Sequence, residues 1–130
     1  MPIRVVRLGT PREPDEGLRL GTVRRPPRGV PRSDFASRDY YDVWLPDLSP
    51  SAALLSWVTS QPITDARWKR FTREYQREMR APTAQRLMAL LAALSAQTNL
   101  SVGCYCADES RCHRSLLRKL LANAGGLIAP

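Results

Sequence analysis

The sequence lacks any apolar run of the roughly 20 residues that a membrane span needs, and its N-terminus lacks the apolar core of a signal peptide. Cysteine is scarce, and its number, 3, is odd, which argues against a disulfide framework. There is one histidine, and no internal repeat or low-complexity segment is visible. We therefore expect a cytoplasmic protein with no membrane partner, whose thiols stay reduced.

Lysine is also scarce: Lys69 and Lys119 are the only two, and every other basic residue is arginine. The net charge is nevertheless +8. Such a surplus attracts polyanions or phosphate-bearing ligands, although an arginine-rich source proteome produces it without any partner. A nucleic-acid-binding module that uses a helix over 67–80 and the loop over 24–32 therefore stays open as an alternative.

The chain of 130 residues has the length of one domain, so we expect a single domain over 1–130. Apolar and β-branched runs predict strands over 3–8, 18–23, 41–45 and 100–105, the third of them buried. Gly21, within the second run, indicates a bulge or a close backbone approach. Strands and helices interleave, which favours an α/β fold: a single compact domain in which helices pack on a small, partly parallel sheet.

Four helices are predicted from caps and apolar spacing. Ser49 and Pro50 are typical of a helix start, and this helix runs to about Val58. A second helix begins near Thr64, where aromatic residues recur at spacings of three and four on a core-facing stripe. The stripe comprises Trp68, Phe71, Tyr75 and Met79. A third begins at Pro82-Thr83, with Leu87, Leu90, Leu91 and Leu94 facing inward, and the last runs from Ser110 or Arg111 to Asn123.

Every cysteine and the histidine fall between Gly103 and Ser115, where a predicted strand, a loop and a helix start follow one another. In open α/β sheets, ligands bind at the carboxyl ends of the strands, and a helix N-terminus attracts anions. The chemistry of the chain, if it has any, is therefore expected in this segment. Neither the phosphatase spacing of cysteine and arginine nor the C-x-x-C redox pattern is present.

The first interpretation is a reactive thiolate. Cys112 would lie in the first turn of the helix beside Arg111 and Arg114, where the pKa of a thiol is depressed. Cys106, in the loop, is the other candidate nucleophile or a resolving thiol. His113 would then serve as a proton shuttle.

Three other interpretations remain open. The cysteines and His113 supply ligand atoms for zinc or haem iron, although their spacing does not match common metal motifs. Arg114, Ser115 and backbone amides could instead hold a phosphate or carboxylate without covalent chemistry. The segment could also be purely structural, with Cys104 a small buried apolar residue and His113 capping the helix or pairing with an acidic neighbour.

Arg114 is electrostatically misplaced in the first turn of a helix, since the helix N-terminus is itself positive. We expect an anion to compensate it, either Asp108 or Glu109 or a bound ligand. The segment over 24–32 contributes further arginines, of which Arg24 and Arg28 are candidate ligands to the same anion.

Three segments carry a resemblance to a known family: YDVWLPDLSPSAALLSW, WKRFTREYQREM and GCYCADESRCHRSLLRKLL. They resemble the YeaO-like family of bacterial and archaeal proteins, with Asp42 to Trp44, Trp68 to Tyr75 and Cys112 to Arg114 as the matching motifs. The resemblance implies a compact α/β fold and indicates a site rather than an activity. The family's Asp and Trp after the second strand are missing here, while Arg24 and Arg28 are kept, which favours their facing the crevice of Cys112.

The sequence thus predicts an anion-binding pocket over the Cys112 helix for a small molecule that carries phosphate or carboxylate. Any reaction would use Cys106 or Cys112 as the nucleophile and His113 as the proton shuttle, while Arg28 and Arg114 hold the anion. No motif specifies a cofactor.

Overall fold

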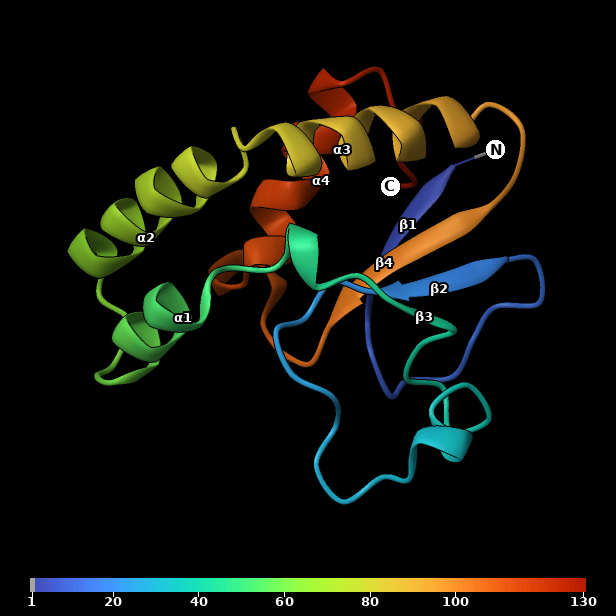
Figure 1. The fold of residues 1–130 in the computed structure, drawn as a ribbon, viewed down its shortest axis with the longest axis horizontal. Helices are drawn as coiled ribbons and strands as arrows, with labels where there is room; N and C mark the ends of the chain where they lie inside the picture. The colour runs from blue at the N-terminus through green and yellow to red at the C-terminus, as the bar shows by residue number, and fades with distance from the viewer. Residues whose placement is uncertain (1) are drawn as a thin grey trace.

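A sheet of four strands forms the centre of the protein in the computed structural model, which describes residues 2–130. The strands are β1 (Ile3–Arg7), β2 (Leu18–Gly21), β3 (Val43–Trp44) and β4 (Leu100–Cys104). Their order is β1-β4-β2-β3, and all three neighbouring pairs are parallel (Figure 1). The carboxyl ends of β1, β2 and β4 therefore lie at one edge of the sheet, which is where the cysteine segment begins.

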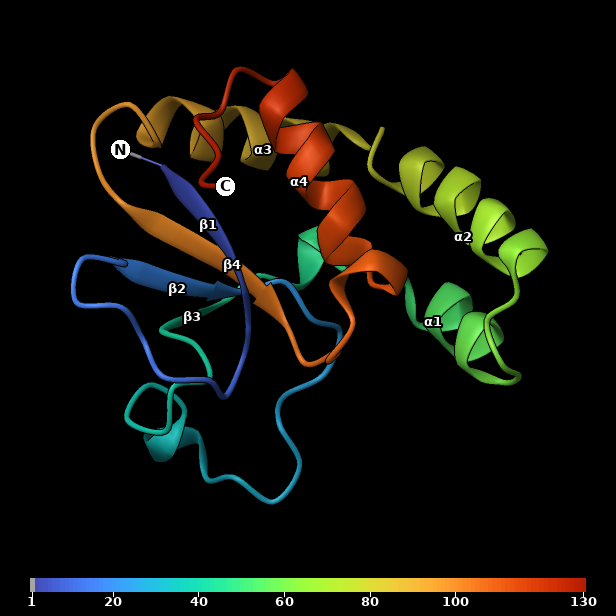
Figure 2. The same ribbon diagram turned by 180° about the vertical axis from the view of Figure 1, so that it is seen from behind.

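The helices are α1 (Ala52–Thr59), α2 (Asp65–Glu78), α3 (Pro82–Leu94) and α4 (His113–Asn123), with short 3₁₀ turns at Arg32–Asp34, Pro46–Leu48 and Glu109–Arg111. Both ribbon views show α3 and α4 beside the sheet, and α1 and α2 packed together further away (Figures 1 and 2). No helix in the described part of the chain is long and apolar enough to cross a membrane.

The helices bury the apolar side of the sheet. Leu100 and Val102 of β4 pack in one core with Leu117 and Leu121 of α4. The stripe on α2 belongs to the same core: Phe71, Tyr75 and Met79 are buried and Trp68 packs at its margin. The predicted α/β class and single compact domain are confirmed, and the sheet is parallel throughout.

The opposite side of the sheet is closed by a buried ion pair. Arg19 of β2 is 0% exposed and Glu16 is 2% exposed. The guanidinium donates to both carboxylate oxygens of Glu16 at 2.8 and 2.9 Å, and to the carbonyls of Thr10 and Asp39. Burial alone raises the pKa of Glu16, but the bonds from Arg19 and Ser101 outweigh it and lower the pKa. The pair thus joins β2 to the loops that cover this side.

The predicted buried strand over 41–45 is wrong in length and burial. Only Val43–Trp44 pairs with β2, and both side chains are 44% exposed because β3 is the edge strand. Tyr41 is the buried member of this segment. Its ring lies where a Cβ on Gly21 would be, 2.3 Å from the nearest ring atom, so the close approach expected at that glycine is present.

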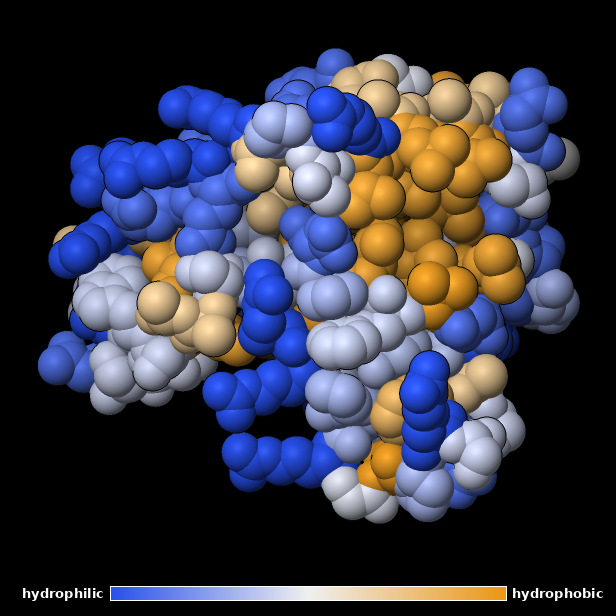
Figure 3. All heavy atoms as spheres, in the orientation of Figure 1, coloured by the Kyte–Doolittle hydropathy of each residue, from blue (hydrophilic) through white to orange (hydrophobic). Residues whose placement is uncertain are grey.

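Two helix details also differ from the prediction. Ser51, rather than Ser49, caps α1 by accepting a bond from the Leu54 amide, because Ser49 donates to the carbonyl of Pro46 instead. On α3, Leu90 and Leu94 were expected to face inward but are 54% and 36% exposed. Figure 3 shows an apolar area over the part of the surface where α3 lies.

The buried pair predicts unequal effects at two adjacent acidic residues. Glu16→Ala leaves Arg19 buried without its counter-ion and should lower the free energy of unfolding by about 3–5 kcal/mol. Asp15→Ala removes an exposed partner of Arg4 and should change it by less than about 1 kcal/mol. Urea denaturation of both variants measures the difference, and equal effects would show that the pair does not stabilise the fold.

Candidate functional site

The cysteine segment runs from the end of β4 through a loop to the start of α4. Gly103 allows a tight approach, since a Cβ there would lie 2.5 Å from the Leu8 side chain. After Cys106, the Asp108 carboxylate accepts bonds from the amide and hydroxyl of Ser110 and so starts the turn Glu109–Arg111. Cys112 is the residue before α4 rather than part of its first turn, because the helix begins at His113.

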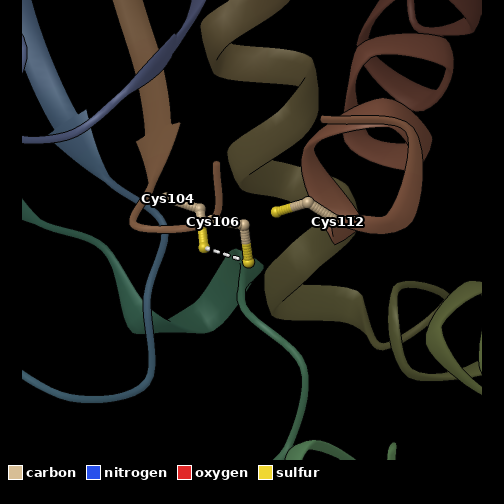
Figure 4. Close-up of side chains that lie close together, drawn as sticks. All are labelled: Cys104, Cys106 and Cys112. Carbon is tan, nitrogen blue, oxygen red and sulfur yellow. Dashed lines mark hydrogen bonds between the residues drawn. The ribbon is translucent and has the colours of Figure 1, made fainter. Parts of the chain in front are cut away.

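This path brings the three cysteines together. Their sulfur atoms all lie within 4.8 Å of one another, and the Cys104 thiol donates to the Cys106 sulfur at 3.8 Å (Figure 4). Cys104 and Cys112 are 7% and 2% exposed, whereas Cys106 is exposed. The cluster therefore has two thiols inside the protein and one at its surface.

His113 is buried and its hydrogen bond assigns its tautomer. Nε2 lies 2.7 Å from the carbonyl oxygen of Thr22, which can only accept, so Nε2 carries the proton. Nδ1 is then an acceptor, 3.8 Å from the Cys112 sulfur. Burial lowers the pKa of His113 to about 4, against the opposing bond to Thr22, and the imidazole is neutral at neutral pH.

The three thiols differ in acidity because of their mutual contacts. The hydrogen bond from Cys104 and the nearby Cys112 thiol hold the pKa of Cys106 far below that of a free thiol. The contact with Cys106 raises the pKa of Cys104 to about 11, and the contacts with Cys104 and Cys106 raise that of Cys112. Negative charge thus concentrates on Cys106. The expectation of a depressed pKa at Cys112 is wrong, because this thiol is buried between two other sulfurs.

Arg114 is buried beneath the loop that carries Cys106 and is not part of a surface ion pair. It is 3% exposed, and Nη2 donates to the carbonyl of Cys106 at 2.7 Å. Its charge also helps to lower the pKa of Cys106. Glu109 instead binds Arg118. Within the described residues, neither of the expected carboxylates forms an ion pair with Arg114, whose contact is the Cys106 carbonyl.

A cavity of about 220 Å³ opens beside the cluster. Cys104, Cys106, Cys112 and His113 line it together with apolar side chains of α1 and α2 and with several arginines. The other lining residues are Val23, Arg24, Arg25, Pro50, Leu55, Val58, Thr59, Ile63, Phe71, Tyr105 and Arg111. No carboxylate is among them, so the cavity favours a ligand that is apolar or negatively charged.

The remaining predicted site residues are distributed differently. Arg24 lines the cavity, but its Nε and Nη2 donate to the carbonyls of Pro50 and Pro46. Arg28 is absent from the lining and belongs to an adjoining hollow. Ser115 donates to the Cys112 carbonyl within the first turn of α4. The structure therefore does not bring Arg28 and Arg114 together in one pocket, where they were predicted to hold the same anion.

Sequence reasoning missed one member of the site. Cys104 is buried as expected, and its sulfur also joins the cluster, as the metal interpretation of the three cysteines requires. Thr22 carried no sequence signal. Its amide and hydroxyl donate to the Gly103 carbonyl at 3.0 and 2.9 Å, and its own carbonyl accepts from His113.

The fold and site define a class of small parallel α/β proteins with a cysteine–histidine cluster at the end of a central strand. Within it, the chain belongs to the family described as the active DUF488-N3 subclade, whose sequence profile matches residues 3–125. It is similar to an uncharacterized protein of Mycobacterium bovis and to two of Mycobacterium tuberculosis. Each is 29% identical over 119 residues, which cover 92% of both chains. No solved structure matches the chain.

The different exposures of the thiols predict selective labelling. Iodoacetamide in native buffer should modify Cys106 first, because access and thiolate character both favour it, while Cys104 and Cys112 should react only after unfolding. Peptide mass spectrometry over a time course locates the label. Cys106→Ser is the control and should leave the native protein unlabelled; modification of Cys112 as fast as Cys106 would contradict the assignment.

Proposed function

We propose that this protein is a cysteine-dependent enzyme whose nucleophile is the Cys106 thiolate. The observation that supports it best is an exposed sulfur that accepts a hydrogen bond from the Cys104 thiol, lies within 4.8 Å of the buried Cys112 sulfur and borders a cavity. A thiolate, not a thiol, is the nucleophile in cysteine chemistry, and a preorganised site lowers the cost of holding it ionised. The substrate is a small electrophile that carries phosphate or carboxylate, as the absence of carboxylates from the cavity lining favours.

The two buried thiols would have a second task. When the Cys106 sulfur bonds to the electrophilic atom, it loses its negative charge. The pKa values of Cys104 and Cys112, which that charge helps to raise, then fall. Either thiol can now give a proton to the departing group, which leaves with the bonding electron pair. Nδ1 of His113, beside Cys112, is placed to accept or return that proton.

Binding of a soft metal ion by the same cluster is the second candidate. Two sulfurs bound tetrahedrally to zinc at about 2.3 Å would be separated by about 3.8 Å, and the Cys104 and Cys106 sulfurs are 3.8 Å apart. A histidine that gives its distal N–H to a carbonyl is also usual beside metals. The 220 Å³ cavity is smaller than the roughly 300 Å³ at which small-molecule pockets begin, so an ion fits it better than a haem.

In the nucleic-acid alternative, several arginines of α2 already make contacts within the protein. Arg67 and Arg70 of α2 lie over the Trp57 ring, 4.3 and 4.6 Å from its centroid, and Arg77 pairs with Glu74. Arg70, Arg73 and Arg77 of α2 are nevertheless exposed, as is Arg80 just beyond its end. We also keep the YeaO-like assignment within this proposal, supported by Cys112 to Arg114 at the start of α4.

The pH dependence of alkylation tests the thiolate. Because its pKa is held low, Cys106 should react with iodoacetamide at rates that change less than about twofold between about pH 8 and about pH 6. An ordinary thiol slows by more than about fiftyfold over that range. Cys112→Ala removes a neighbouring thiol that helps to lower the pKa of Cys106 and should restore part of this dependence. A wild-type profile like that of N-acetylcysteine would overturn the proposal.

The same assay separates the two candidates. Protein purified without chelator is analysed for zinc and alkylated before and after EDTA treatment. The enzyme proposal expects no bound zinc and no effect of EDTA on the rate. One equivalent of zinc that blocks Cys106 until EDTA removes it would establish the metal site and overturn the proposal.

A further inference from the structure

The hollow that adjoins the cysteine cavity is lined by two arginines, two tyrosines and two prolines. Its volume is about 590 Å³, and its residues are Arg25, Pro26, Pro27, Arg28, Tyr40 and Tyr105. Arg25 and Tyr105 also line the cysteine cavity, so the two spaces share a wall. Tyr105 directly precedes Cys106. A molecule that reaches the Cys106 sulfur can therefore extend into the hollow.

The hollow has positive charge that no neighbouring residue balances. Arg25 and Arg28 are both exposed, and neither makes an ion pair or a side-chain hydrogen bond within the described residues 2–130. No carboxylate lines the hollow. A guanidinium binds phosphate or carboxylate oxygens through two parallel N–H bonds, so two unpaired guanidiniums favour an anionic group.

The backbone that carries these arginines is held in place. The Tyr105 hydroxyl donates to the Arg25 carbonyl at 2.8 Å, and the Trp44 ring N–H donates to the Val23 carbonyl at 2.8 Å. Pro26 and Pro27 then restrict the backbone between the two arginines. Because this segment is ordered before any ligand arrives, less conformational entropy is lost on binding.

Two tyrosines line the hollow, and one of them, Tyr105, also lines the cysteine cavity. The rings of Tyr40 and Tyr105 meet edge to face with centroids 6.3 Å apart. Their positive edges and the Tyr40 hydroxyl suit an anionic or aromatic group better than an aliphatic one. The hollow is therefore lined by two guanidinium groups and two aromatic rings.

We infer that the hollow of Arg25, Arg28, Tyr40 and Tyr105 is a subsite for an anionic oxygen group, phosphate or carboxylate, of a molecule whose electrophilic end reaches Cys106. The inference rests on the proposed function for the electrophilic end only. The anion subsite depends on the arginines and can be measured without the thiol.

Charged and neutral alkylating agents test the subsite at Cys106. The ratio of the iodoacetate rate to the iodoacetamide rate should exceed that of N-acetylcysteine amide. It should fall about fivefold in the Arg25→Ala/Arg28→Ala double variant, as expected for charges at this range. Arg73→Ala, on exposed α2, is the matched control and should leave the ratio unchanged. An equal ratio in wild type and the double variant would overturn the inference.

A second readout avoids the thiol. In Cys106→Ser, inorganic phosphate or acetate at constant ionic strength should raise the melting temperature by mass action, and the double arginine substitution should abolish the rise. The stronger of the two anions identifies the group. No rise with either anion overturns the subsite. Slow alkylation of Cys106 by both agents, with the rise intact, overturns only the proposed function.

Discussion

The site depends on one hydrogen bond, from Nε2–H of His113 to the carbonyl of Thr22. Thr22 follows β2 and is itself bonded to Gly103 at the end of β4. The bond therefore attaches the first residue of α4 to two neighbouring strands. Cys112 directly precedes His113. Its sulfur therefore lies within 4.8 Å of the sulfur of Cys104, the last residue of β4 (Figure 4).

The attachment of α4 determines which of the three sulfurs is the easiest to ionise. Two sulfurs are buried and one is exposed, so ionisation is cheapest at Cys106, where water and the charge of Arg114 assist. The buried thiols keep their protons, and Cys104 donates its proton to the Cys106 sulfur. An otherwise similar loop with Cys112 at the surface would distribute the charge differently, which is why the attachment of α4 matters for reactivity and not only for stability.

Local signals in the sequence were sufficient for much of the fold. The stripe on α2 was predicted because apolar residues at helical spacing have few alternatives to a core. The location of the cysteine segment was predicted because strand, loop and helix start are all written between Gly103 and Ser115. These features depend on neighbours within a few residues.

Features that depend on distant residues were not predictable. The sequence leaves Cys104 open between a buried core residue and a metal ligand, since nothing local shows that the Cys112 sulfur lies beside it. Arg19 lies in an amphipathic-looking strand, and only the fold reveals that Glu16 and two carbonyls bury its charge. The strand over 41–45 was expected to be buried, but its position at the sheet edge is a property of topology. Arg28 was placed with Arg114 on motif grounds, while the path of the proline segment puts it in the adjoining hollow.

The central claim is that one of the three thiols is ionised in the folded protein at neutral pH. The ultraviolet absorbance of thiolate measures this directly when wild type and Cys106→Ser are titrated side by side. The account predicts that native wild type at neutral pH exceeds the variant by the absorbance of one thiolate, and that unfolding removes the difference. Identical absorbance of the two proteins until the pH passes that of an ordinary thiol, about 8.5, would contradict it.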